Sequence, residues 1–482
     1  MEFNFAFAET GILQVQEAFA ENRITSEELV RLYLERIARY DKEGPAVNSV
    51  LEINPDAVQT AMALDYERST LGISSNLHGI PILIKDNIET ADKMHTSAGS
   101  LALKDAYAGR DAFIIKKLRR AGAIILGKTN MTEWANYMSD TMPAGYSSRG
   151  GQVLNPYGPK TLSPGGSSSG SGAAVTCNFC CAALGTETSG SIVDPSSILS
   201  IVGIKPTVGL VSRNGIIPAA YGQDTAGTMT RSVEDGALLL GAIAGYDCED
   251  PITALCRDKT YSDYTRFLDK NGLSGIRIGV LRKNYFDDLT EEEVEIMENS
   301  LNILRENGAV IIDDITLPNN NKESSKRINL YEFKRDINHY LSGLDAHLPV
   351  HSLSELIAYH KTCPETMLKF GQSYLEFAEQ TSGSLKEADY ILKGLNQRVS
   401  SRKAIEDILL EYKADVLVSP GDKAALIINM AGFPMVTVPA GIQKNGKCLG
   451  ITFTAEAFSE PRLLKYAYAF EQHAQKRTPP PV

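Results

Sequence analysis

The chain has 482 residues, of which 43% are hydrophobic and 22% are charged, a composition typical of a globular protein with a large core. Its net charge is −11, from 48 basic and 59 acidic residues, and the basic residues form no stripe. Nucleic acid is therefore not expected as a partner, because phosphate neutralisation needs clustered cations. No segment approaches the ~20 consecutive apolar residues that span a membrane.

The N-terminal sequence MEFNFAFAET carries acidic residues and no basic region before an apolar run. No signal peptide is predicted from it, and the cytoplasm is the expected location. Among seven cysteines, Cys177 and Cys180 form a CxxC motif. The sequence around this motif is apolar and lacks a second pair of ligands, so we interpret it as buried helix and expect no metal there.

The first ~70 residues are expected to be mainly helical. Thr25 and Glu28 form a capping-box pair before LVRLYLERIARY, which marks a helix start. The apolar run GIPILIKDN (79–87) predicts a buried strand whose functional end is Lys85.

Residues 111–120 have helical periodicity, and AIIL (123–126) predicts a short buried strand that ends in a turn at Gly127. Helix followed by buried strand is the alternation expected of a sheet covered by helices. The Gly- and Ser-rich segment GGSSSGSG (165–172) has the composition of a linker. Because apolar segments resume directly after it, we interpret it as an ordered loop inside one domain.

We therefore predict a single domain with four parts. These are N-terminal helices at about 1–70, a catalytic core at 71–260, a variable cap-like region at 261–412, and C-terminal strands and a helix at 413–482. The variable part is more helical and charged than its neighbours. The last part contains the strand-like runs VLVSP, MVTVPAG and LGITF before a helix opened by Pro461.

Two segments match known functional motifs letter by letter, but we do not assign them the chemistry of those motifs. GAIILGKT (122–129) fits the phosphate-binding pattern that ends at Lys128, but its four central residues form the strand and cannot wrap a phosphate. GSSSG (166–170) places Ser168 at the centre of GxSxG, but no strand precedes it. The downstream histidines that such a hydrolase needs lie in no recognisable loop context: His339, His347, His351, His360 and His473.

A third pattern accounts for more of the sequence. Ser191, in the turn GTETSGS, follows Ser167 of the first Gly-rich loop by 24 residues. Lys85 ends an apolar strand, where desolvation lowers a lysine pKa and favours the neutral amine that can accept a proton from a serine. From these residues alone an alternative stays open, in which Lys85 pairs with Asp86 or another acid at the end of the strand.

Three segments resemble the signature of the amidase signature family: PGGSSSGSGAAV (164–175), GTETSGSIVDP (185–195) and VGIKPTVGLVS (202–212). GIPILIKDN and GAIILGKTNMTEWA are similar to its lysine-bearing segment and its strand and turn. The resemblance covers about 25–260 and 413–475, and it is weak at 270–410. It implies an α/β fold with a large central, mixed and twisted β-sheet covered by helices on both faces, and a more helical cap-like insertion.

The resemblance also implies a Ser–cisSer–Lys triad without metal or cofactor. Ser191 takes the place of the nucleophile, Ser167 that of the bridging residue beside a cis peptide bond, and Lys85 that of the general base and acid. The implied reaction is hydrolysis of a carboxamide to a carboxylate and ammonia or an amine, through an acyl-serine intermediate. The implied oxyanion hole consists of the backbone N–H groups of Thr188, Ser189, Gly190 and Ser191.

Within the family, three segments look closest to the peptide amidase branch: GTETxGSIV, VGLVSRNGIIP (208–218) and GQDTAGTM (222–229). Enzymes of this branch hydrolyse C-terminal carboxamides of peptides. Two departures from the family lie near the nucleophile. Val193 stands where the family often has arginine, and Ser189 precedes Gly190 where two glycines are common. Both are expected to bear on substrate choice.

Two other functions stay open. The glutamine-hydrolysing subunit of a tRNA-dependent amidotransferase shares the triad, but its branch commonly keeps the arginine that Val193 replaces. A non-catalytic binding protein that retains the fold is the second. As partners we expect a small-molecule or peptide amide, and neither nucleic acid nor a membrane; a homodimer stays open.

Overall fold

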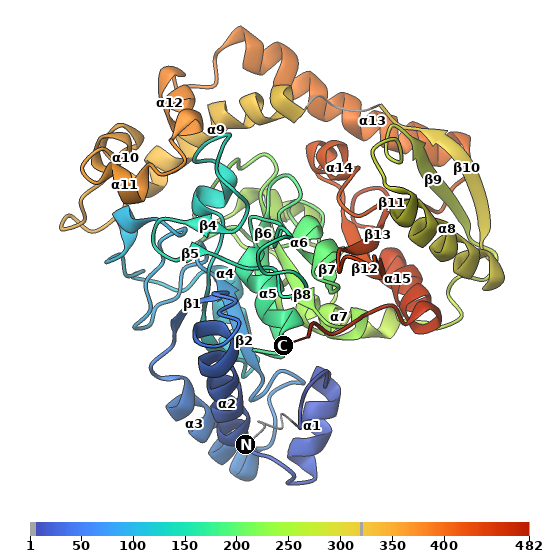
Figure 1. The fold of residues 1–482 in the computed structure, drawn as a ribbon, viewed down its shortest axis with the longest axis horizontal. Coiled ribbons are helices and arrows are strands. Elements are labelled where there is room, and N and C mark those ends of the chain that lie inside the picture. The colour runs from blue at the N-terminus through green and yellow to red at the C-terminus, as the bar shows by residue number, and fades with distance from the viewer. Residues whose placement is uncertain (1–5, 319–321, 482) are drawn as a thin grey trace.

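The computed structural model describes residues 6–318 and 322–481 (Figure 1). Within them, a sheet of 11 strands has the order β1-β3-β2-β6-β8-β7-β12-β13-β11-β9-β10, and β4 and β5 form a separate pair. Neighbours such as β2 and β6 are parallel while β6 and β8 are antiparallel, so the predicted mixed sheet is confirmed. The strands are β1 (Val50–Ile53), β2 (Pro81–Lys85), β3 (Ile124–Thr129), β4 (Tyr146–Ser147), β5 (Gly151–Gln152), β6 (Ala182–Glu187), β7 (Val202–Lys205), β8 (Thr225–Thr230), β9 (Arg277–Lys283), β10 (Val310–Thr316), β11 (Val416–Pro420), β12 (Met435–Ile442) and β13 (Cys448–Thr454).

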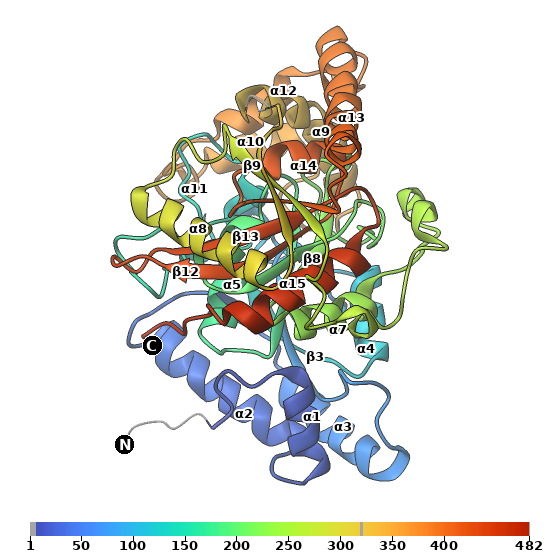
Figure 2. The ribbon, with the colours of Figure 1, turned by 90° about the vertical axis from the view of Figure 1, so that its right-hand side faces the viewer.

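Helices cover both faces of this sheet, as expected (Figures 1 and 2). α5 contacts α6, and α7 contacts α4 and α15. Every residue of β2, β3, β6 and β8 is buried, which is the pattern of strands covered on two sides. The helices are α1 (Ile12–Ala20), α2 (Ser26–Arg36), α3 (Ala57–Leu71), α4 (Phe113–Arg120), α5 (Ser169–Thr176), α6 (Val193–Ile198), α7 (Val233–Ile243), α8 (Glu291–Glu306), α9 (Lys322–Ser342), α10 (Leu353–His360), α11 (Pro364–Met367), α12 (Ser373–Gln380), α13 (Asn396–Glu411), α14 (Ala425–Ala431) and α15 (Glu460–Ala474).

The segment 261–412 contributes to two structures. Its first part supplies β9 and β10, which extend the main sheet at one edge. Its second part supplies α9 to α13, at the upper edge of Figure 1, and we call these helices the cap. The cap shares a second apolar cluster with core residues that include Trp134, and Tyr137 stacks on Phe333 of α9 at 5.4 Å between ring centroids. The boundaries of the four parts stay a prediction.

Two local predictions were wrong. β3 does not end at Gly127 but continues to Thr129, because Lys128 and Thr129 pair with both β1 and β2. The glycine is needed for close packing and not for a turn, since a Cβ on it would collide with the carbonyl oxygen of Glu52 in β1. The CxxC motif does not lie in a helix: α5 ends at Thr176, and Cys177 and Cys180 lie in the turn before β6. Both cysteines are buried and free, and burial raises the pKa of both thiols.

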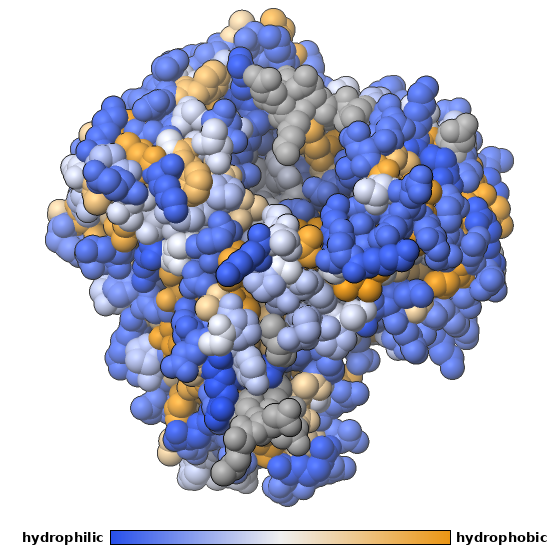
Figure 3. Space-filling view, in the orientation of Figure 1, coloured by the Kyte–Doolittle hydropathy of each residue, from blue (hydrophilic) through white to orange (hydrophobic). Residues whose placement is uncertain are grey.

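The described part of the chain contains no helix that is both long and apolar enough to cross a membrane. The face shown in Figure 3 is mostly hydrophilic, and its apolar residues gather in small separate groups. This distribution agrees with the net charge of −11.

The predicted capping box is present at the start of α2. Glu28 N donates to Thr25 Oγ1 at 3.1 Å, and Thr25 N donates to the Glu28 carboxylate at 2.8 Å. Loss of a helix N-cap costs about 1 kcal/mol. Thr25→Ala is therefore expected to raise the hydrogen-exchange rates of α2 amides about fivefold, whereas Thr25→Ser is expected to keep the wild-type rates. Equal exchange in the two variants would contradict the cap.

Candidate active site

Lys85 lies at the end of β2, and its side chain is fully buried. β2 pairs in parallel with β6, so the ends of the two strands meet at one edge of the sheet. There the Lys85 amine lies 2.8 Å from Ser167 Oγ, 2.9 Å from Ser168 Oγ and 3.1 Å from the carbonyl oxygen of Thr186. The structure therefore brings together two segments that the sequence separates by 82 residues.

The hydrogens around this amine can be assigned by counting donors. A serine hydroxyl has one hydrogen, and that of Ser168 is donated to the Thr186 carbonyl oxygen at 3.1 Å. Ser168 Oγ can therefore only accept from Lys85, as can the Thr186 carbonyl. A neutral amine has two hydrogens and one lone pair, so Ser167 is left as the hydroxyl that can donate its hydrogen to the lone pair.

Burial supplies the neutral amine. Desolvation at this position lowers the pKa of Lys85 to about 7, although the nearby carboxylates of Glu187 and Asp224 act in the opposite direction. At neutral pH a large share of Lys85 is therefore unprotonated. The alternative pairing with Asp86 is not what the structure has. Asp86 instead accepts from Gly99 N at 2.8 Å and lies 3.5 Å from Arg149.

Ser191 lies in the loop between β6 and α6 and is 9% exposed. The two serine loops are joined directly, because Ser168 N donates to the Ser191 carbonyl oxygen at 3.2 Å. The peptide bond between Gly166 and Ser167 is cis, as the family resemblance implies.

The N–H groups of Ser189, Gly190 and Ser191 donate to no acceptor within residues 6–318 and 322–481. Gly190 has a φ of +111°, a left-handed conformation that favours glycine. A Cβ on it would meet no atom closer than 3.9 Å. Three consecutive amides without an acceptor, beside an open space, are compatible with the oxyanion hole that the resemblance implies.

Two acidic residues, the buried Glu187 and the partly buried Asp224, hold this loop in place. Glu187 accepts from Ile192 N at 2.6 Å, from Val193 N at 3.0 Å and from the side-chain amide of Asn429 at 2.7 Å. Thr188 is held on its other side, because its hydroxyl donates to Asp224 at 2.6 Å. These contacts fix the loop at both ends of the turn that presents Ser191.

Gln223 and Asp224 were not singled out from the sequence as single residues, although they lie in the quoted motif GQDTAGTM. The Gln223 amide donates to the Thr188 carbonyl oxygen at 3.0 Å, and Asp224 also accepts from Ala219 N and Ala220 N. Their contact with the loop that carries Ser191, the nucleophile loop, is visible only in the fold. Gln223, for example, is 35 residues from Thr188 in the sequence.

One of the two sequence departures near Ser191, Val193, lies in the core, whereas the residue after it connects two loops. Val193 is fully buried in the main core and offers no surface to a substrate. Asp194, the next residue, accepts from Gly166 N at 2.9 Å, while its own N–H donates to the Gly190 carbonyl oxygen at 2.8 Å. Asp194 thus ties the nucleophile loop to the residue that precedes Ser167.

The rejected phosphate-binding motif lies on the strand next to Lys85, with Thr129 paired to Lys85, but its lysine makes other contacts. The Lys128 amine is fully buried and donates to the Ile88 carbonyl and, at 2.9 Å, to Thr96 Oγ1. The described residues contain no group of three or more His, Cys, Asp or Glu side chains that could hold a metal ion.

A family model described as Amidase matches residues 28–426 of the chain. The chain belongs to the amidase family. The resemblance inferred from the serine and lysine segments is therefore confirmed, and so is the expected activity: the protein is an enzyme that hydrolyses amides.

Three relatives place the chain within this family. The crystal structure of the peptide amidase of Stenotrophomonas maltophilia is 41% identical, covers 99% of both chains and has a TM-score of 0.93. A protein named Probable amidase from Arabidopsis thaliana is 40% identical over 99% of this chain and 92% of its own length. A glutamyl-tRNA(Gln) amidotransferase subunit of Methylobacillus flagellatus is 32% identical over 95% of this chain and 96% of its own. The amidotransferase alternative is therefore less favoured.

The burial of three lysines predicts a distinctive titration. Desolvation lowers the pKa of Lys85 to about 7 and those of Lys128 and Lys205 to about 8. NMR of protein with labelled lysine side chains is expected to show these three signals titrating below the others. Lys85→Met removes the lowest signal and so assigns it. A Lys85 signal that titrates near the ordinary value of about 10.4 would contradict the neutral amine.

Proposed function

We propose that the chain hydrolyses the C-terminal carboxamide of peptides through a Ser191–Ser167–Lys85 relay. The observation that carries the relay is the Lys85 amine, fully buried and within hydrogen-bond distance of Ser167. The peptide part of the proposal is supported by the 41% identity to a peptide amidase over nearly the whole of both chains.

The relay begins with neutral Lys85, which accepts the hydrogen of Ser167. Ser167 in turn accepts the hydrogen of Ser191 while Ser191 Oγ attacks the amide carbonyl carbon. The negative charge that forms on the carbonyl oxygen is stabilised by the backbone N–H groups of residues 188–191. The proton returns through Ser167 to the leaving nitrogen, the C–N bond breaks, and ammonia leaves an acyl-Ser191.

In the hydrolysis of the acyl-enzyme, water is the nucleophile and Ser191 Oγ is the leaving group. Water takes the place of the leaving ammonia and gives a proton to the relay as it attacks the ester carbonyl. Ser191 recovers its hydrogen when the ester bond breaks, and the peptide carboxylate is released. In this scheme Ser168, Glu187, Asp194 and Asp224 position the reacting groups and do not exchange protons with substrate.

The single chain is expected to release ammonia from peptide amides faster than from free glutamine. Ser191→Ala is expected to lower kcat/KM by about 10⁴-fold or more, with large losses for Ser167→Ala and Lys85→Met, because members of a relay act as a unit. Ammonia release from a panel of peptide amides, simple amides and glutamine measures this, with thermal unfolding to show that each variant is folded.

Ser168→Ala is the matched control for Ser167→Ala, because both hydroxyls contact the Lys85 amine. Its loss is expected to be the smaller one. A larger loss of kcat/KM for Ser168→Ala than for Ser167→Ala would indicate that Ser168, and not Ser167, donates its hydrogen to Lys85. A fully active Lys85→Met variant would contradict the relay. Glutamine as the preferred substrate would favour the amidotransferase alternative, and no turnover of any amide would favour the non-catalytic binding protein.

The lowered pKa of Lys85 also sets the pH dependence. Below about pH 7 the amine is protonated and cannot accept a proton, so kcat/KM is expected to fall tenfold for each unit of pH below that value and to level off above it. The measurement is the initial rate at low peptide-amide concentration across the pH range in which the protein stays folded. A rate independent of pH between about 5 and 8 would contradict a catalytic lysine.

The cytoplasmic location and the homodimer stay predictions. The proposal needs neither, since all residues of the relay come from one chain.

A further inference from the structure

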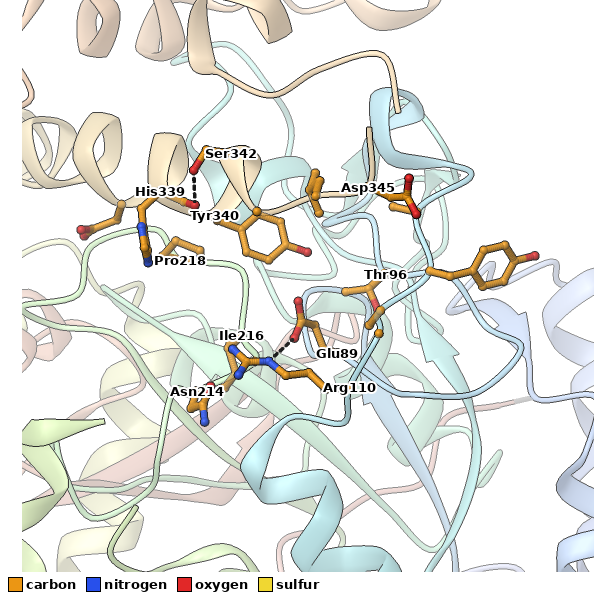
Figure 4. Close-up of a pocket in the computed structure, with 18 of the residues that line it drawn as sticks. Glu89, Thr96, Arg110, Asn214, Ile216, Pro218, His339, Tyr340, Ser342 and Asp345 are labelled. Atoms are coloured by element: carbon orange, nitrogen blue, oxygen red, sulfur yellow. Dashed lines mark hydrogen bonds and ion pairs between the residues drawn. The ribbon is translucent and has the colours of Figure 1, made fainter. Parts of the chain in front are cut away.

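A hollow of about 650 Å³ lies between the core and the end of α9, the first cap helix (Figure 4). Three stretches that are far apart in the sequence line it: the loop after β2, the loop after β7, and the C-terminal end of α9. Its described lining residues do not include Lys85, Ser167 or Ser191. Its volume lies within the range of small-molecule sites, so the chemistry of its walls decides what it can hold.

Glu89 is a charged residue on the wall of this hollow, and its side chain is only 13% exposed. The nearest cation is the Arg110 guanidinium, whose Nε lies 3.9 Å from the carboxylate, beyond hydrogen-bond distance. Arg110 is 57% exposed and donates instead to Glu249 at 3.2 Å. The Glu89 carboxylate therefore has a loose ion pair and can accept a closer cation.

The other groups near Glu89 leave part of its hydrogen-bonding capacity unused. Figure 4 shows Tyr340 of α9 with its hydroxyl directed toward the Glu89 side chain. Lys128 lies behind the wall, but its amine donates to Ile88 and Thr96 and to no oxygen of Glu89. Burial raises the pKa of Glu89 despite Arg110 and Lys128, which indicates that the carboxylate is incompletely compensated.

The remaining wall suits the body of an organic cation. Ile216 and Pro218 supply apolar surface, and Tyr107 supplies an aromatic ring. This residue is 56% exposed, and its ring packs on that of His95 at 4.1 Å between centroids. Aromatic faces attract cations, and a carboxylate beside them gives a charge-assisted hydrogen bond to an ammonium group. Two further carboxylates line the hollow: that of Asp345 lies at its edge, and that of Asp336 accepts from Tyr221 N at 3.1 Å.

We propose that this hollow is a second binding site, separate from the amide-hydrolysing site, for a small organic ammonium ion. The ammonium group binds Glu89, and the apolar body of the ligand lies against Ile216, Pro218 and Tyr107. This site does not depend on the proposed relay, because no residue of the relay lines it.

The test uses 2-phenylethylamine, which is a cation at pH 8, and its uncharged counterpart 2-phenylethanol. Calorimetric titration of the full chain at low salt is expected to show binding of the amine that is at least tenfold tighter than that of the alcohol. Glu89→Gln, which keeps the shape and removes the charge, is expected to weaken the amine about tenfold or more. Glu17→Gln, an exposed carboxylate far from the hollow, is expected to leave the affinity unchanged.

Gly109→Trp provides a second variant that does not alter Glu89. Gly109 lines the hollow, and a Cβ on it would meet no atom within 4 Å, so a large side chain can fill the space without a clash in the fold. Amine binding is expected to disappear in this variant while amide hydrolysis continues. Equal affinity for the amine in wild type, Glu89→Gln and Gly109→Trp, or equal affinity for the amine and the alcohol, would overturn the proposal.

Discussion

The catalytic geometry depends on the contact between the buried amine of Lys85 and the hydroxyl of Ser167. An ammonium group at this position would have to be removed from water without a carboxylate in direct contact, so burial favours the neutral form. A neutral amine has a single lone pair, and its neighbours decide which hydroxyl can use it. Because the Ser168 hydrogen is donated to Thr186, that hydroxyl is Ser167. One backbone carbonyl thus separates two adjacent serines into different roles.

The segments of the site meet where β2 and β6 end. Lys85 ends β2, Thr186 lies near the end of β6, and the two strands are hydrogen-bonded neighbours in parallel. The loop with Ser191 begins where β6 ends, and Asp194 joins it to the loop with Ser167. The contacts between these segments are therefore set by strand pairing and by short side-chain hydrogen bonds, and not by long flexible connections.

The sequence was informative where a local pattern decides the structure. The all-apolar strand that stops at Lys85, the capping box at Thr25 and the paired serine segments are each readable from adjacent residues. Gly127 was misread because the need for a glycine comes from Glu52 on a neighbouring strand. The alternation that predicts helices and strands carries no information about such contacts between segments.

For the same reason, the support of the active site escaped sequence reasoning. Asp224 and Gln223 contact Thr188 from a distant loop, and Asn429 reaches Glu187 across 242 residues. The substrate is the part least determined by sequence, because no motif in the cap indicates a ligand, and the cap packs on the core through its own apolar cluster. The residues of the proposed relay belong to the core.

The order of strands also constrains how the protein can be made. β12 and β13 are among the last elements of the chain, yet they lie in the interior of the sheet, between β7 and β11. Until they have left the ribosome, no strand joins the two halves of the sheet, and β7 and β11 each present an unpaired edge. Unpaired strand edges are the surfaces on which nascent chains aggregate. The nascent protein is therefore most vulnerable just before synthesis ends, and a chain truncated before β12 would remain in that state permanently.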